Sequence, residues 1–579
     1  MRTNKELRIQ LREIDRKSYP AYKSLTGAYG FEKYILSIDH VQGDPFASPS
    51  SVHVEIPYET AGFPVEYCEQ PCMRIAMEDY LIRQLEKAFE QYNFKAKGSG
   101  KSGLMSISRC GQEVLERSAC QIKDKKIIVR FLVGFPAFGR TIDAKGLEKI
   151  LFEFLPECIE KSLFYRNIHQ EKLQEAVWLA QDQEAIRQLL KENGWVAFIA
   201  NQSVLPRKSG VSQLPLKESI PFESPKSMEK TLNLPHRGAI RGMAIPKGIT
   251  LIVGGGYHGK STLLEAVQQG VYNHIAGDGR EYVITDQTAV KLRAEDGRGI
   301  RNVNISMFIN DLPNKKDTVR FSTEDASGST SQAACLVEGI EAESKLFLID
   351  EDTSATNFMV RDEFMQQVIT RDKEPITPFL ERAVDLYRQL DISTILVAGS
   401  SGAFFHIADH ILLMDCYKPV DITLKVKELC KKRISPEMSA PGFSVPDFQR
   451  ILPAYQCVKD KRNEHMKVKT MGRDGFSINK ENIDIRYLEQ LADSEQTAAL
   501  AYFTRYILER KLDGKRTVRQ IVKETWKLLE GKGWEEFCGA YVPCGLAKPR
   551  IQELYAYKNN IEKGCTYGQK RRDYVFIRQ

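Results

Sequence analysis

A glycine-rich stretch near the middle of the chain, 251–264 (LIVGGGYHGKSTLL), most constrains the fold. The apolar run 249–253 is typical of a buried parallel strand, and the run 263–269 has helical character. The stretch matches the pattern G-x-x-x-x-G-K-[ST] without a mismatch, through Gly254, Gly259, Lys260 and Ser261. Strand, glycine turn and helix follow in the order that a phosphate-binding loop requires. The sequence therefore predicts an α/β core that binds a nucleoside triphosphate.

The chemistry of phosphate binding explains the residue types in this loop. Glycines let backbone N–H groups close on phosphate oxygens, and the N-terminus of the following helix adds positive potential. Lys260 is expected to reach the β- and γ-phosphates, and the Ser261 hydroxyl to ligate Mg²⁺. The pattern does not fix Tyr257 or His258, and for the His258 side chain solvent exposure is favoured over a nucleotide contact. The predicted phosphate contacts are Gly254, Gly255, Gly256, Tyr257, His258, Gly259, Lys260, Ser261 and Thr262.

Two carboxylates end a second apolar run, 345–351 (KLFLIDE). Asp350 is the predicted Mg²⁺ partner, directly or through water. Glu351, one residue on, suits a base that orients the attacking water. Acidic residues at strand ends also occur as plain solvated turns, but the apolar run and its distance from Lys260 favour the catalytic interpretation.

Other segments separate the classes of phosphate-loop protein. Ser327, Gly328 and Ser329 lie 23 to 21 residues before Asp350 and precede a helical run. They resemble the Ser-Gly-Gly signature of ABC-type ATPases, whose serine and backbone N–H groups cap the γ-phosphate held by the other subunit. The loop 354–357 resembles the dimer-contacting loop of the same class, with Asn357 where Asp is usual.

The strand predicted at 393–398 leads to the position of the γ-phosphate-sensing histidine in ABC ATPases. Ser400 stands nearby and is taken as a catalytic residue, and no histidine follows before His406. The absence of that histidine puts the sensing step or its rate in doubt.

A GTPase is the alternative that the sequence disfavours. Asp296 begins a DxxG match and Asn314 an NKxD match, but only 18 residues separate them. The helix and strand that a GTPase needs between these motifs do not fit in that distance.

The whole set resembles the family described as predicted ATPases of the ABC class. The resemblance rests on GGGYHGKSTLL, FSTEDASGSTSQAA and LIDEDTSATNFMVRD in the core, and on GDPFASPS, GSGKSG and GFPAFGR near the N-terminus. It implies an ABC-type ATPase core flanked by N- and C-terminal domains, and relatives have been linked to RNA. No Gln stands 40–50 residues after Lys260. Glu295, Asp296 and Arg298 lie in the region where ABC proteins have their Gln-bearing loop, and they either take over metal or coupling contacts or form a structural ion-pair cluster.

Four ranges divide the 579 residues. They are an α+β N-terminal domain (1–200), a Pro-, Ser- and Gly-rich linker (201–225), the ATPase core (226–435) and a mainly helical C-terminal domain (436–579). The net charge of +7 is uneven, since residues 441–579 hold 26 Lys and Arg against 18 Asp and Glu. A basic domain is compatible with nucleic acid, and equally with a merely solvated surface.

No apolar run approaches the roughly 20 residues of a membrane span, and the N-terminus is too charged for a signal peptide. The scattered cysteines fit reduced thiols, so a cytoplasmic protein is expected. The loop 97–103 (KGSGKSG) lacks the first glycine of a phosphate loop, but as a flexible cationic loop it could touch nucleic acid. Phe222 is a possible stacking partner for adenine, although it lies far upstream.

One phosphate loop and one signature per chain do not complete a site if the signature acts in trans. The sequence therefore predicts a homodimer that sandwiches two Mg-ATP, coupled to nucleic acid, RNA more than DNA. The alternatives are a nucleotide-gated dimerisation scaffold with slow turnover and an energiser of a separate membrane partner.

Overall fold

The computed structural model describes residues 1–362, 364, 368–399, 401–433, 440, 442, 444–454 and 466–556. The chain forms two compact units. The first contains Met1–Asp182 and Gly531–Lys548, and the second contains Gln183–Glu530 and Pro549–Gln579. The helix α6 (Gln170–Asn193) begins in the first unit and ends in the second.

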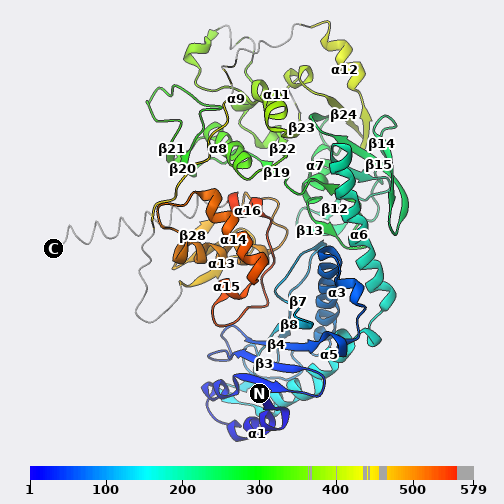
Figure 1. Ribbon diagram of the computed structural model, residues 1–579, viewed down its shortest axis with the longest axis vertical. Helices are drawn as coiled ribbons and strands as arrows, with labels where there is room; N and C mark the ends of the chain where they lie inside the picture. Colours follow the sequence, from blue (N-terminus) through cyan, green and yellow to red (C-terminus); the bar gives the residue numbers. More distant parts are fainter. Residues whose placement is uncertain are drawn as a thin grey trace, which may run out of the picture. The chain divides into compact units, whose positions relative to one another are not determined.

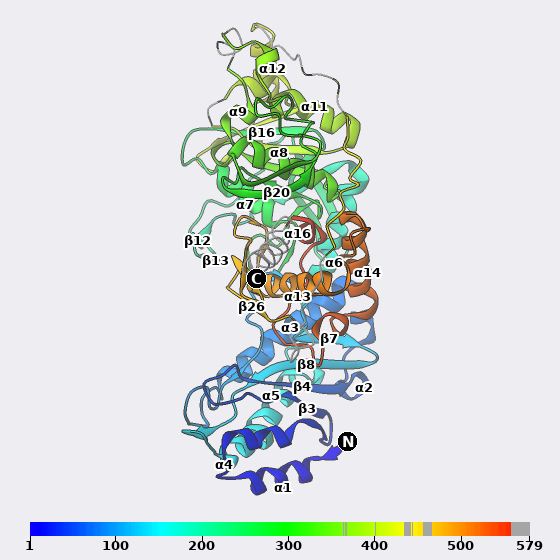
Figure 2. The same ribbon diagram turned by 90° about the vertical axis from the view of Figure 1, so that its left-hand side faces the viewer.

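A seven-stranded sheet forms the centre of the first unit (Figure 2). Its order is β1 (Arg2–Thr3), β2 (Gly27–Gly30), β3 (Ile35–His40), β4 (Ser50–Pro57), β8 (Lys126–Val133) and β5 (Met105–Ser106), with β7 (Cys120–Lys123) also paired to β8. All pairs except β1 with β2 are antiparallel. The helix α3 (Pro71–Glu90) contacts β5 and β7 and buries Met77, Leu81 and Leu85. The expected α+β N-terminal region is confirmed.

Local sequence explains where α1 (Asn4–Ile14) begins and which face it buries. Thr3 and Glu6 form a reciprocal capping box at its start, which satisfies backbone donors that a helix end leaves free. Leu7, Leu11 and Ile14 recur at helical spacing and are all buried. The capping box and the apolar spacing therefore account for the start and the buried face of this helix.

The sequence suggested a flexible loop at 97–103. In the structure, backbone hydrogen bonds hold this segment as a junction within the first unit. Three backbone N–H groups donate to carbonyls elsewhere in the first unit: Ser99 to Ala137 at 2.7 Å, Lys101 to Pro45 at 2.8 Å and Gly103 to Gly134 at 2.9 Å. A Cβ on Gly134 would lie only 1.8 Å from the carbonyl oxygen of Lys101. These three amides are therefore engaged within the first unit, and Gly134 serves the close backbone packing against the loop.

The second unit is built on a six-stranded sheet, around which α7 (Lys260–Gln269) and α11 (Phe379–Leu390) pack (Figure 1). Its order is β19 (Val290–Leu292), β22 (Leu346–Asp350), β23 (Ser393–Val397), β16 (Ile249–Val253), β24 (His410–Asp415) and β25 (Lys418–Asp421). The first five strands are parallel, and β25 pairs antiparallel with β24. β16, β22 and β23 are buried at every position, as their uninterrupted apolar runs predict.

An antiparallel sheet adjoins the core in the same unit. It consists of β14 (Glu229–Leu234), β15 (Gly238–Pro246), β11 (Trp195–Ala200) and β18 (Val283–Thr285). Ile186 and Leu190 of α6 share a hydrophobic cluster with Phe198 and Ile284 of this sheet. The range 201–225, predicted as a linker, contains the short hairpin β12 (Arg207–Ser209) and β13 (Ser212–Pro215).

The C-terminal part contains more strand than its pattern indicated. A three-stranded sheet, β26 (Val468–Thr470), β27 (Gly475–Ile478) and β28 (Glu481–Asp484), precedes α13 (Ser494–Arg510), α14 (Val518–Lys532) and α16 (Ile551–Ala556). Helix α13 begins at Ser494, where Asp493 and Gln496 form a capping box. Helices still dominate this part, and the predicted fold class is confirmed.

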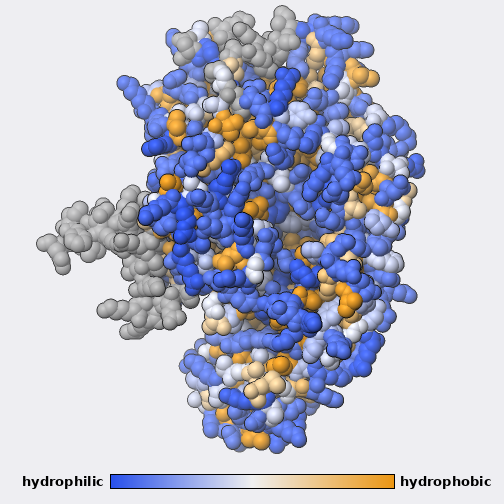
Figure 3. Space-filling view, viewed as in Figure 1, coloured by the Kyte–Doolittle hydropathy of each residue, from blue (hydrophilic) through white to orange (hydrophobic). Residues whose placement is uncertain are grey.

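Within the described residues, no helix combines the length and the apolar character that crossing a membrane requires. On the face shown in Figure 3, hydrophilic side chains predominate and hydrophobic ones occur in small groups.

Candidate nucleotide-binding site

The phosphate loop lies between β16 and α7. Gly254 and Gly259 have φ angles of 143° and 95°, which favour glycine. A Cβ on Gly254 would also lie 2.5 Å from the carbonyl oxygen of Met414 in the neighbouring strand β24. Between the two glycines, residues 255–257 are exposed. The loop thus presents a bare backbone at the carboxyl end of a central parallel strand, where α/β sheets bind ligands.

Lys260 opens α7, and its side chain folds back over the loop. The Nζ donates to the carbonyl oxygens of Gly254 at 2.7 Å and Gly255 at 2.9 Å. Phosphate oxygens are charged acceptors and form stronger hydrogen bonds than neutral carbonyls. The ammonium group is therefore positioned over the loop and can exchange its carbonyl partners for phosphate. Ser261 and Thr262 follow in the first turn, with Ser261 exposed.

The two predicted carboxylates end β22, which β23 separates from β16. Because these strands are parallel, their carboxyl ends and the phosphate loop share one edge of the sheet. Asp350 is 8% exposed, and its carboxylate accepts the N–H of Asp352 at 3.3 Å. Burial lowers the pKa of Lys291 on β19, while the charge of Asp350 opposes that shift. The Asp350 carboxylate thus favours the charged form of the buried Lys291 side chain.

Glu351 is held by the segment that follows β23. Its Oε2 accepts the backbone N–H of Gly399 at 2.5 Å. This contact places the predicted water-orienting carboxylate beside the predicted γ-phosphate-sensing segment. Ser400, the residue predicted to act there, lies outside the described residues. His406 ends the 3₁₀ helix Ala403–His406 further along the chain.

The predicted signature residues lie at the start of α8 (Gly328–Glu341). Ser327 is the N-cap residue, and its Oγ lies 2.9 Å from the Oγ1 of Thr330. Ser329 donates its Oγ–H to Oδ1 of Asn357 at 2.7 Å. Within the described part of the chain, no hydrogen bond or ion pair joins Ser327–Ser329 to the phosphate loop. The signature is instead tied to the loop 354–357 of its own chain.

The two interpretations of Glu295, Asp296 and Arg298 are resolved by their contacts. Arg298 forms ion pairs with Glu338 of α8 and, at 3.9 Å, with Glu295. Burial raises the pKa of Glu295, against the lowering effect of Arg298. Glu295 and Arg298 therefore belong to a structural ion-pair cluster with Glu338 of α8. Asp296 differs, because its Oδ1 would lie 3.2 Å from a Cβ on Gly328 and so faces the signature.

Phe222 is not available to stack on a base. Its side chain is 1% exposed, its N–H donates to the carbonyl of Ser203 at 2.9 Å, and its carbonyl accepts the N–H of Gln202 at 2.8 Å. The apolar packing of the segment before the core buries the ring, so the suggested role for Phe222 is wrong.

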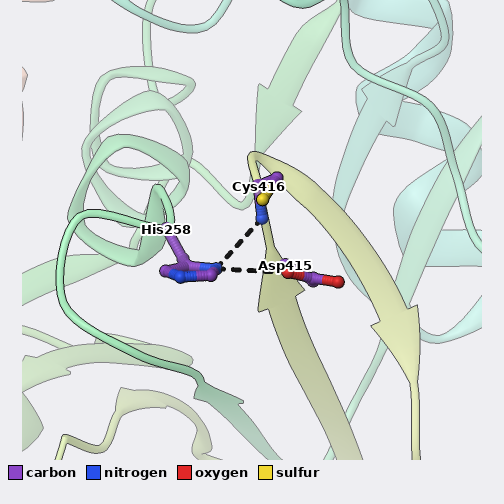
Figure 4. Close-up of side chains that lie close together, drawn as sticks. All are labelled: His258, Asp415 and Cys416. Carbon is purple, nitrogen blue, oxygen red and sulfur yellow. Dashed lines mark hydrogen bonds and ion pairs between the residues drawn. The ribbon is translucent and has the colours of Figure 1, made fainter.

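A turn that the sequence did not single out lies against the phosphate loop (Figure 4). It joins β24 to β25, and its residue Cys416 donates its N–H to Nδ1 of His258 at 3.0 Å. Asp415 lies 3.3 Å from the same nitrogen. His258 is therefore held by this turn, with its side chain 38% exposed. The turn is more than 150 residues away in sequence and carries no phosphate-binding pattern, so no sequence signal pointed to it.

The donor set fits a magnesium ion. Asp350 offers a buried carboxylate and Ser261 an exposed hydroxyl at the same edge of the sheet, and Mg²⁺ prefers such oxygen ligands together with phosphate and water.

Comparison with known proteins identifies the parts of the chain. Residues 169–448 match a family model described as a P-loop domain of the ABC ATPases. Residues 4–166 match the model described as the N-terminal part of ATPases of the ABC class. The chain belongs to the ATPases of the ABC class. Residues 467–565 match a third model, the MRB1590 C-terminal domain. The P-loop domain supports ATP binding by this ABC-class chain.

A curated relative of this ABC-class chain is the uncharacterized protein MJ1628 of Methanocaldococcus jannaschii. It is 30% identical over 299 residues, which cover 50% of this chain and 65% of the relative. The match thus spans just under two thirds of that protein's length.

Two solved structures resemble the chain over 41% of its length. One is cbiO1 from Clostridium perfringens, part of the ABC transporter complex cbiONQ, with 13% identity, 94% of that chain covered and a TM-score of 0.26. The other is the ADP conformation of MJ1267, an ATP-binding cassette of an ABC transporter, with 10% identity, 95% covered and a TM-score of 0.25.

Proposed function

We propose that this chain binds and hydrolyses Mg-ATP as a homodimer, in which the partner completes each of two sites. The observation that carries the proposal is the distribution of the site residues within one chain. The phosphate loop, Asp350 and Glu351 share one edge of the parallel sheet. Ser327–Ser329 makes no bond to that loop among the described residues and begins a separate helix. One chain therefore supplies two halves that suit two different sites.

Each half has a defined task. The loop amides and Lys260 bind the β- and γ-phosphates, and Ser261 and Asp350 hold Mg²⁺, which neutralises phosphate charge when bound. Glu351 orients a water for in-line attack and accepts its proton. The Gly399 N–H fixes the direction of the Glu351 carboxylate. Ser327–Ser329 of one protomer caps the γ-phosphate held by the other.

A complementation experiment tests the trans arrangement. A Lys260→Ala chain lacks a working phosphate loop, and a Ser327→Arg chain blocks the signature with a bulky side chain. Mixing the two leaves one intact composite site per heterodimer, so the mixture should hydrolyse ATP although neither variant does alone. If the signature acted within its own chain, mixing would restore nothing and the proposed homodimer site would be wrong. The double variant carrying both changes, mixed with either single variant, is the matched control and should stay inactive.

Coupling to single-stranded nucleic acid, RNA more than DNA, is the second candidate function. It is favoured by two exposed aromatic rings beside the 97–103 junction, Phe46 (65% exposed) and Phe138 (63% exposed). The Phe46 ring would lie 3.0 Å from a Cβ on Gly100, and the exposed Lys97 belongs to the same junction. Aromatic rings among cations are the usual means of binding single strands without sequence preference.

ATPase assays with RNA, with DNA and without nucleic acid, each at two salt concentrations, test this coupling. Stimulation that weakens steeply with salt supports it, because phosphate contacts release counterions. Very slow turnover with no stimulation would favour a nucleotide-gated scaffold instead. Fast ATP turnover that nucleic acid does not change would favour the remaining alternative, an energiser of a separate membrane partner.

A further inference from the structure

The phosphate loop does not account for recognition of the base of a nucleotide. Phe222 is buried, and no Phe, Tyr or Trp occurs between residues 223 and 256. Tyr257 lies within the loop but is 99% exposed, and no other described side chain holds its ring. A pre-positioned aromatic platform for the base must therefore come from elsewhere in the fold.

The strand order indicates on which side of the loop the base lies. β22, with Asp350 and Glu351, lies on one side of β16, whereas β24 and β25 lie on the other. The γ-phosphate and its metal ion must point toward the two carboxylates. The ribose and base then extend toward the opposite side, where the turn between β24 and β25 meets the loop.

Two hydrogen bonds fix this turn to the phosphate loop. Cys416 N–H donates to Nδ1 of His258 at 3.0 Å, and Tyr417 N–H donates to the carbonyl of the same histidine at 3.1 Å. The Asp415 carboxylate lies 3.3 Å from the same Nδ1 atom (Figure 4). Both central residues of the turn, Cys416 and Tyr417, have positive φ angles of 46° and 67°. Two side-chain-bearing residues thus occupy a conformation that favours glycine, and the His258 contacts stabilise it.

The ring of Tyr417 lies directly beside the start of α7. A Cβ on Gly259 would be 2.7 Å from Cδ1 of Tyr417, so the tyrosine packs on the bare backbone of the glycine. Tyr417 is nevertheless 47% exposed as a residue, which leaves part of the ring open to a ligand. Lys418, the next residue, pairs with Glu223 at 3.2 Å and anchors the turn from its other end.

We propose that Tyr417 is the base-stacking residue of this nucleotide site, and that His258 positions it by holding the turn. The ligand chemistry is the aromatic base of a nucleoside triphosphate, adenine in ATP. The inference rests on the proposed function, because it assigns a residue to the same ATP site. Tyr417 contacts the base, and His258 is a positioning residue that acts through the turn.

Equilibrium binding of ATP and of inorganic tripolyphosphate to the full-length chain tests the assignment. Tyr417→Ala should weaken ATP binding about 5- to 150-fold, the range for loss of one base–aromatic stack. It should leave tripolyphosphate binding unchanged, since that ligand has no base. Tyr417→Phe keeps the ring and should bind ATP as the wild-type chain does. Val420→Ala, at a position on β25 that is 45% exposed, is the matched control for damage to the hairpin.

Two results would overturn the assignment while leaving the ATPase proposal intact. ATP binding by Tyr417→Ala at wild-type strength would show that the ring does not contact the base. Equal weakening of ATP and tripolyphosphate would show that Tyr417 only shapes the phosphate loop. By contrast, a wild-type chain that binds neither ligand would refute the proposed function, and this assignment with it.

Discussion

The backbone N–H of Gly399 donates to Oε2 of Glu351 at 2.5 Å. This bond joins the ends of two neighbouring parallel strands, β22 and β23, and orients the carboxylate that we assign to the attacking water. Glu351→Gln preserves the size of the side chain and an oxygen that can accept this bond, but the amide takes no proton. We expect kcat for ATP hydrolysis to fall about 10²- to 10⁴-fold, the usual contribution of a general base, with ATP affinity retained.

The neighbouring carboxylate provides the control. Asp352 is exposed, and one of its oxygens would lie 3.9 Å from a Cβ on Gly399. Asp352→Asn should leave kcat within a few-fold of the wild-type value. Loss of turnover in Asp352→Asn, with normal turnover in Glu351→Gln, would show that Asp352 is the base and that our assignment of Glu351 is wrong. Chromatography of Glu351→Gln with ATP should also show a stable dimer, since the nucleotide is no longer consumed.

Lys260→Ala removes the ammonium group that spans the loop through Gly254 and Gly255. A hydrogen bond to a charged group contributes about 1.5–3 kcal/mol, so loss of the phosphate contacts should weaken ATP binding at least about tenfold. Calorimetric titration measures this directly. Lys247→Ala, which breaks an exposed ion pair with Asp391, is the control and should not alter the affinity. Unchanged ATP binding by Lys260→Ala would contradict the assignment of the loop.

The parallel core and most of its site could be predicted because their sequence signals are local. The apolar runs at 249–253 and 345–350 encode buried strands, and the glycines between Gly254 and Gly259 encode the turn. The turn at Tyr417 could not be predicted, because its contact with Gly259 depends on how β24 lies beside β16. The error over Phe222 has the same origin, since burial depends on tertiary packing that one segment does not encode.

Ser329 and Asn357 lie 28 residues apart in sequence and form a 2.7 Å hydrogen bond between the signature and the loop 354–357. Ser329→Ala and Asn357→Ala should each reduce the free energy of unfolding by about 1 kcal/mol, the net value of a typical hydrogen bond. The double variant should cost no more than either single one, because both remove the same bond. Asn357→Asp retains an accepting oxygen and should be close to neutral. Additive losses in chemical denaturation would show that the two side chains are not coupled.

Close backbone packing at the 97–103 junction makes Gly134 sensitive to substitution. The Cβ of an alanine there would overlap the carbonyl oxygen of Lys101, which is fixed by backbone bonds on both sides. Gly134→Ala should therefore reduce the free energy of unfolding by about 1–3 kcal/mol, as overpacking generally does. Gly43 has open space around it, so Gly43→Ala should be nearly neutral. Equal stability of the two variants would show that the junction yields to a methyl group.

Glu78 on α3 gives the first unit a pH-dependent stability. It is 1% exposed, pairs with Arg74 at 2.8 Å and accepts the N–H of Ile122 at 2.7 Å. Burial raises its pKa from an ordinary value of 4.5 to about 8, outweighing the lowering effect of Arg74. Between these two pH values the folded chain holds a proton that the unfolded chain has released. The contribution of Glu78 to the free energy of unfolding is therefore complete below the pKa that the carboxyl has in the unfolded chain. It disappears as the pH rises through the pKa that the carboxyl has in the folded chain.

Chemical denaturation between pH 5 and pH 9 measures this effect as the difference between the wild-type chain and Glu78→Gln. The glutamine side chain does not titrate in this range. The free energy of unfolding of the wild type should therefore fall relative to that of Glu78→Gln as the pH rises toward 8, with the slope given by a difference of about one bound proton between the folded and unfolded states. Glu90→Gln changes an exposed carboxyl on the same helix and should follow the wild-type profile. A wild-type stability that rises relative to Glu78→Gln over this range would mean that the ion pair with Arg74 outweighs burial, and that Glu78 is ionised in the folded chain.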